Sequence, residues 1–168
     1  MCEPERALVL VSVTGDGKSS TGNTLAGREV FEVSAGLSSE TSRCAHADFI
    51  CSAGLYRVVD TVGLHDTNLR AEEVLTRFSE FAELTPCGID AFLFVVRWGR
   101  FKLEHVAALA AFEANCGASA LERTLLVFTH CGARGPRERD ELRRALREDA
   151  PTPLRDWAAR LGGAVAVD

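Results

Sequence analysis

The segment LVLVSVTGDGKSSTGNTLAG, Leu8–Gly27, decides the fold. Its apolar beginning is typical of a buried strand, and Ser19–Ala26 has a helix-like pattern. A glycine-rich turn between a strand and a helix predicts a phosphate-binding loop, because backbone N–H groups and the positive end of the helix dipole then point at the same oxygens. The residues that we expect to contact a nucleotide here are Thr14, Gly15, Asp16, Gly17, Lys18, Ser19 and Ser20.

Two side chains in this loop have specific expected roles. Lys18, one of only two lysines among the 19 basic residues, would bring a mobile positive charge to the β and γ phosphates. The Ser19 hydroxyl is a hard oxygen ligand that suits Mg²⁺. The loop departs from the pattern GxxxxGK[ST] at Ser12, which stands where the first glycine would be. A serine is tolerated there if its φ is negative; the alternative is that the glycines form only a tight turn.

A second motif, DTVG, follows an apolar strand and ends at Gly63. A carboxylate at that strand tip, Asp60, can hold Mg²⁺ through water, and the Gly63 N–H can bond a γ phosphate. The polar stretch 37–44 lies between the two motifs, where a nucleotide-sensing segment would offer a hydroxyl to the metal. We choose Thr41 for this metal-binding role, with Ser38, Ser39 and Ser42 as alternatives.

Apolar strand-like runs alternate with amphipathic helix-like stretches along the whole chain, which predicts an α/β fold. We expect a mainly parallel central sheet with one antiparallel hairpin and helices on both faces. The expected strands are Ala7–Ser12, Ala45–Ser52, Leu55–Asp60, Ala91–Arg97, Leu125–His130 and Ala164–Asp168. The expected helices after the first are about 71–83, Leu103–Cys116 and two near the end of the chain, separated by a break at Ala150–Pro153.

Size and charge limit the function classes. The 168 residues predict a single domain, and the net charge of −5 argues against a nucleic-acid binder. The longest apolar run, Ala91–Val96, is too short to span a membrane, so we expect no transmembrane segment. Six widely spaced cysteines without metal-binding spacing are typical of free thiols in a reducing compartment, which predicts a cytoplasmic location.

Five segments of the chain resemble the AIG-type, immunity-associated (GIMAP-like) GTPases, a family related to the septins and the chloroplast import receptor GTPases. The resemblance covers nearly the whole chain in the right order. It implies a Ras-like P-loop NTPase G domain that binds GTP and GDP with Mg²⁺ and often pairs with another G domain, as a homodimer or heterodimer. The segments that carry it are TGDGKSSTGNTLAG (14–27), FEVSAGLSSETSRC (31–44), DTVGL (60–64), FLFVVRWGRF (92–101) and LLVFTH (125–130).

The resemblance also implies roles for single residues. Thr41 would be the switch threonine on Mg²⁺, Asp60 and Gly63 the second-switch pair, and Thr129-His130 the guanine-side motif, with His130 against the base. Alternatively, His130 only caps a strand end. Where family members often have acidic residues that read guanine, this chain has Cys131, Gly132 and Ala133, so adenine binding stays open. Because the sequence stops at Asp168, we expect the domain to lack the loop that encloses the base and the following helices.

These observations predict a GTP/GDP-binding switch with slow hydrolysis. Ras-like enzymes orient the attacking water with a glutamine, and Leu64 holds that place here. Arg100, just past the strand Ala91–Arg97, is our candidate catalytic residue, supplied across a dimer to the neighbour's γ phosphate. The alternatives for Arg100 are a solvated loop residue or an ion pair with Glu104, and Arg97 competes for the role. The alternative functions are a non-hydrolysing scaffold or dimerisation module and a P-loop ATP binder.

Overall fold

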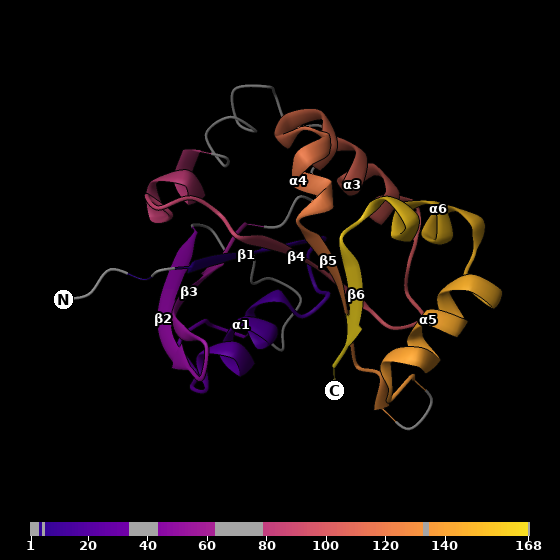
Figure 1. Cartoon of the computed structure of the whole chain (residues 1–168), viewed down its shortest axis with the longest axis horizontal. Helices are drawn as coiled ribbons and strands as arrows, with labels where there is room; N and C mark the ends of the chain where they lie inside the picture. The colour runs from indigo at the N-terminus through magenta and orange to yellow at the C-terminus, as the bar shows by residue number, and fades with distance from the viewer. Residues whose placement is uncertain (1–3, 5, 34–43, 63–78, 133–134, 168) are drawn as a thin grey trace.

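A six-stranded sheet in the order β2-β3-β1-β4-β5-β6 forms the centre of the molecule (Figure 1). The computed structural model describes residues 4, 6–33, 44–62, 79–132 and 135–167. Every neighbouring pair of strands is parallel except β2 and β3, which form an antiparallel hairpin. The strands are β1 (Arg6–Ser12), β2 (Ala45–Cys51), β3 (Gly54–Asp60), β4 (Ala91–Arg97), β5 (Thr124–Thr129) and β6 (Gly163–Ala166). The expected α/β sheet with one hairpin is therefore confirmed.

Helices cover both faces of the sheet, as the sequence predicted. Side chains alternate along β1, so that Val9 and Val11 face one core cluster and Leu10 faces the other. Helix α1 (Lys18–Ala26) packs on the Leu10 side, and α3 (Leu103–Cys116), α5 (Arg139–Glu148) and α6 (Thr152–Arg160) pack on the opposite side (Figure 1). The central strands are buried from both sides, which explains why their sequences are almost wholly apolar.

Several element boundaries differ from those expected. Helix α1 begins at Lys18, β5 ends at Thr129, and β6 runs from Gly163 only to Ala166. A short helix, α4 (Ala118–Glu122), follows α3 directly. The sequence did not predict it, because a five-residue segment shows too little helical periodicity. Of the helix expected at about 71–83, residues 79–84 are described and are helical. The break between α5 and α6 is confirmed, because α6 begins directly after Pro151.

None of the helices in the described part of the chain has the length and apolar character needed to cross a membrane.

Helix α1 lies unusually close to the sheet at Gly22. A Cβ atom on Gly22 would lie 2.7 Å from the ring of Phe31 and 3.0 Å from Cδ1 of Leu10. The neighbouring Asn23 fixes the segment that carries Phe31: its Oδ1 accepts the N–H groups of Val30 and Phe31 at 2.8 Å each, and its Nδ2 donates to the Phe31 carbonyl at 2.9 Å. The small residue lets α1 pack closely on Leu10 of β1, and the amide holds the segment after α1 against the helix.

We predict that Gly22→Ala destabilises the fold. A glycine-to-alanine change in an exposed helix interior stabilises by about 0.5–1 kcal/mol. Here the new methyl group meets the Phe31 ring, so unfolding in urea should show a loss of about 1–3 kcal/mol. The exposed Thr24→Ala in the same helix is the control and should change stability by at most about 0.5 kcal/mol. A Gly22→Ala protein more stable than wild type would disprove the close contact.

Candidate functional site

The loop after β1 has the backbone shape of a phosphate-binding nest. Gly15 and Gly17 have φ values of 90° and 96°, a left-handed conformation that side chains rarely adopt, and Gly17 is the N-cap of α1. Among the described residues only His130 combines a side chain with a positive φ, so Ser12 sits without strain at the end of β1. The serine in the first glycine's place is therefore compatible with the loop.

Lys18 is enclosed at the start of α1, with only 7% of its surface exposed. Burial lowers the pKa of its ammonium group, while the negative charges of Asp60 and Asp16 act in the opposite direction. The single lysine of the loop is therefore buried within the electrostatic influence of two carboxylates. A bound phosphate would enter a site in which the positive charge is already in place.

Ser19 and Asp60 meet across the sheet edge, although 41 residues separate them in the chain. The Ser19 hydroxyl donates to Asp60 Oδ2 at 2.6 Å, and Asp60 is 1% exposed. Burial raises the pKa of the Asp60 carboxyl, against the effect of the Ser19 hydrogen bond and of the Lys18 charge. Asp60 Oδ1 is buried, and no partner for it exists within the described residues. An unsatisfied carboxylate oxygen beside a hydroxyl is a set of hard donors that fits Mg²⁺.

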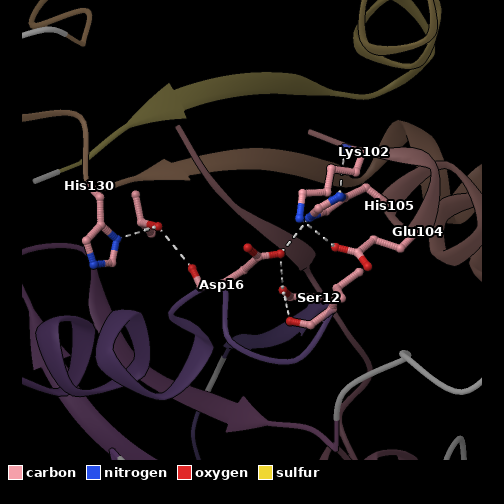
Figure 2. Close-up of polar contacts among 8 residues, drawn as sticks. Ser12, Asp16, Lys102, Glu104, His105 and His130 are labelled. Atoms are coloured by element: carbon pink, nitrogen blue, oxygen red, sulfur yellow. Dashed lines mark hydrogen bonds and ion pairs between the residues drawn. The ribbon is translucent and has the colours of Figure 1, made fainter. Parts of the chain in front are cut away.

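The end of β5 closes the other side of the loop. Thr129 Oγ1 donates to the Asp16 carbonyl oxygen at 3.0 Å, and a Cβ on Gly17 would lie 3.5 Å from Thr129 Oγ1 and 3.8 Å from His130 Cε1. His130 was expected inside the strand, but it follows it with a φ of 55° and its exposed ring beside Thr129 (Figure 2). The left-handed turn releases the ring from the sheet, so that it borders the phosphate loop.

The residue after His130 faces the core. Cys131 is buried, and its Sγ donates to the Phe128 carbonyl at 3.5 Å. Gly132 offers no side chain and turns the chain with a φ of 48°, while Ala133 lies outside the described residues. Positions 131 and 132 thus present no acidic group to a base.

Arg100 lies in the exposed loop between β4 and α3. Its N–H donates to the Arg97 carbonyl at 3.0 Å, and its side chain is exposed. The expected alternative, an ion pair with Glu104, is not what the structure contains: Glu104 lies 3.9 Å from the ammonium of Lys102. Arg100 is therefore a solvent-exposed residue that forms no ion pair with Glu104. Other residues chosen from the sequence lie outside the described part of the chain: Thr41, its alternatives Ser38, Ser39 and Ser42, and Gly63 and Leu64.

Residues 6–166 match the model of the AIG1 family. The chain belongs to the AIG1 family. Immune-associated nucleotide-binding proteins 9 and 7 of Arabidopsis thaliana are each 35% identical to it, over 75% and 73% of this chain and 37% and 40% of their own lengths. The chain thus spans about two-fifths of the curated relatives that it matches.

Solved structures agree on the fold. Toc33 from Arabidopsis thaliana in complex with GDP and Mg²⁺ is 25% identical and superimposes with a TM-score of 0.65 over 96% of this chain and 69% of Toc33. Era from Aquifex aeolicus bound to GDP and AlF₄⁻ is 18% identical, with a TM-score of 0.63 over 96% of this chain and 50% of Era. The expected Ras-like fold is therefore confirmed for this AIG1 member.

Sequence reasoning missed one buried contact of this AIG1 site. His105 Nε2 lies 2.7 Å from Asp16 Oδ2, which connects the first turn of α3 to the phosphate loop (Figure 2). An acidic residue between the two loop glycines was the available signal, because a buried carboxylate there requires a partner. The sequence does not show which of the four histidines provides it.

We predict that Ser19→Ala removes most of the Mg²⁺ dependence of nucleotide release. In wild type, chelating Mg²⁺ with EDTA should accelerate release of a fluorescent GDP analogue about tenfold or more, because the metal joins phosphate oxygens to the protein. In Ser19→Ala, release should be fast already, and EDTA should change it less than about twofold. Thr24→Ala, which removes an exposed hydroxyl from the same helix, should respond like wild type. An unaltered EDTA response in Ser19→Ala would exclude this serine as a ligand.

Proposed function

We propose that this AIG1-family domain is a guanine-nucleotide-binding switch that takes GTP or GDP together with Mg²⁺. The observation that carries the proposal is the convergence of three groups at one loop: the nest at Gly15 and Gly17, the buried Lys18, and the Ser19–Asp60 contact. The Toc33 structures, determined with GDP and Mg²⁺ or with GMPPNP and Mg²⁺, support this choice of ligand.

Each group has a distinct task in such a switch. The loop N–H groups and the positive end of α1 bind phosphate oxygens, and Lys18 balances the β and γ charges. Mg²⁺, when bound, neutralises charge that develops on the phosphates. Ser19 and Asp60 would hold it, with Asp60 acting through water, and Thr41 and Gly63 remain the proposed contacts of the two switch segments. His130 is proposed to lie against the base.

An ATP-binding function is the second candidate. It is favoured because the residue after His130, Cys131, is buried and is not an acid that could bind guanine. Guanine is distinguished from adenine by an acceptor for its N1–H and amino group, and positions 131 and 132 supply none. The family membership favours guanine. Direct titration therefore decides between them.

We predict that the chain binds GDP and GTP more tightly than ADP and ATP in Mg²⁺, as calorimetry with the four nucleotides would show. Lys18→Ala should weaken GTP binding about 100-fold or more, because it removes charge-assisted hydrogen bonds worth about 1.5–3 kcal/mol each. Lys102→Ala, which removes the other lysine, an exposed one, should retain affinity within about threefold. Unchanged affinity in Lys18→Ala would end the phosphate-loop assignment, and tighter ATP binding would favour the second candidate.

Hydrolysis is proposed to be slow and to depend on pairing of two G domains. Leu64 cannot hydrogen-bond a water, so the single domain lacks the residue that orients the nucleophile in Ras-like enzymes. Arg100 stands at the carboxyl end of β4, the edge at which ligands bind in open α/β sheets, and its exposed guanidinium could enter a partner's site. Dimerisation is stated to be important for the GTPase activity of Toc33 and Toc159, which supports a similar arrangement. A domain that pairs without hydrolysis would instead be a scaffold.

We predict that GTP turnover per molecule rises with protein concentration in wild type and stays low and constant in Arg100→Ala. An arginine supplied in trans stabilises charge on the γ phosphate and is worth about 10³–10⁵ in rate. Arg97→Ala tests the competing arginine, and Arg155→Ala on α6 controls for the loss of one surface charge. Identical concentration profiles for wild type and Arg100→Ala would remove Arg100 from the mechanism.

A cytoplasmic location also remains a proposal. Among the described residues, the cysteines at positions 44, 51, 87, 116 and 131 form no disulfide with one another, which supports a reducing compartment.

A further inference from the structure

The phosphate loop carries a buried carboxylate, Asp16, whose side chain contacts the start of α3. The Asp16 side chain extends toward Ser12 and the start of α3, where its Oδ2 lies 2.7 Å from His105 Nε2 and 3.5 Å from Ser12 Oγ (Figure 2). Asp16 is 7% exposed and His105 1% exposed. A carboxylate in this position needs a hydrogen-bond donor that fixes its orientation, because the phosphates that the loop is proposed to bind would repel it.

The hydrogen bonds of His105 fix the form of its ring. The backbone N–H of Lys102 donates to His105 Nδ1 at 3.0 Å, so Nδ1 accepts and carries no hydrogen. The ring hydrogen is therefore on Nε2, from which it is donated to Asp16. The ring also stacks on Phe101, with centroids 5.4 Å apart. This assigns His105 as a neutral imidazole with both nitrogens engaged, and Asp16 as the carboxylate that accepts.

Asp16 links this histidine to the remaining parts of the site. Its carbonyl oxygen accepts the Thr129 hydroxyl at 3.0 Å, and its charge acts on Lys18, two residues further along the loop. On the histidine side, the same ring holds the N–H of Lys102, next to the loop that carries Arg100. The Asp16–His105 contact therefore joins the phosphate loop to the segment between β4 and α3.

We propose that His105 is a positioning residue: it holds the Asp16 carboxylate on the α3 side of the phosphate loop and so keeps this charge away from the bound phosphates. The inference rests on the proposed nucleotide-binding function and deepens it. It follows that loss of the His105 hydrogen bond is harmful chiefly because it releases a negative charge. Removing that charge should then compensate for the loss.

Three substitutions separate the Asp16 charge, the hydrogen bond from His105 to Asp16 (the clamp) and the hydrogen bond from the Lys102 N–H to His105 at the start of α3. His105→Asn retains an acceptor near the Nδ1 position for the Lys102 N–H but does not reach Asp16. His105→Gln retains a donor near the Nε2 position and loses the acceptor for Lys102. Asp16→Asn keeps an oxygen that can accept from His105 but carries no charge. All are first compared by thermal unfolding, so that release rates are read only on folded protein.

We predict that His105→Asn accelerates release of a fluorescent GTP analogue about tenfold, with a smaller effect on GDP, which carries less charge. The double variant Asp16→Asn/His105→Asn should return to within about threefold of wild type, a coupling that a double-mutant cycle measures. His105→Gln should also release nucleotide within about threefold of wild type, because it keeps the clamp. If Asp16→Asn has the same effect in both backgrounds, His105 serves packing alone and the proposal is wrong.

A second measurement needs neither nucleotide nor variants. In the nucleotide-free protein, ¹⁵N spectra of the His105 ring should show an unprotonated Nδ1 and a protonated Nε2 at neutral pH; a charged ring or the opposite tautomer would overturn the clamp. The two proposals fail in different ways. A wild-type chain that binds no guanine nucleotide refutes the proposed function and with it the predicted effect on release, whereas nucleotide binding with additive substitutions refutes the positioning role alone.

Discussion

The candidate site depends on one geometric constraint: four neighbouring parallel strands, β3, β1, β4 and β5, end at the same edge of the sheet. Each strand delivers one part of the site there. The phosphate loop follows β1, Asp60 ends β3, the segment with Arg100 follows β4, and His130 follows β5. Because parallel strands point the same way, polar groups far apart in the chain are brought together without any local sequence relation between them.

Charges at this edge are buried and mutually dependent. The negative charges of Asp60 and Asp16 both act on Lys18, and each carboxylate has a hydrogen-bond partner of its own, the Ser19 hydroxyl and the His105 ring. Such an arrangement offsets the cost of burying charge in the protein without nucleotide. Within the described residues, Oδ1 of Asp60 has no hydrogen-bond partner, so this oxygen is the place at which a cation would add most.

The backbone of the phosphate loop is fixed from several directions. Thr21 of α1 donates to the Gly17 carbonyl, Thr129 bonds the carbonyl of Asp16, and His105 bonds the Asp16 side chain. A loop that is supported in this way keeps its N–H groups oriented before a ligand arrives, which reduces the entropy lost on binding. The contact from α3 also joins the loop to the segment that carries Arg100, because His105 bonds both Asp16 and the Lys102 N–H.

The sequence alone determined the α/β fold, the phosphate loop and the family, because these depend on local patterns: apolar strands, the glycine spacing, and a lysine before a helix. It also placed Asp60 at a strand tip. Tertiary structure alone decided which distant groups meet. Asp16 and His105 are 89 residues apart, and neither has a local feature that identifies the other. The left-handed turn of His130 was equally beyond local pattern, because a non-glycine residue gives little sequence signal for a positive φ.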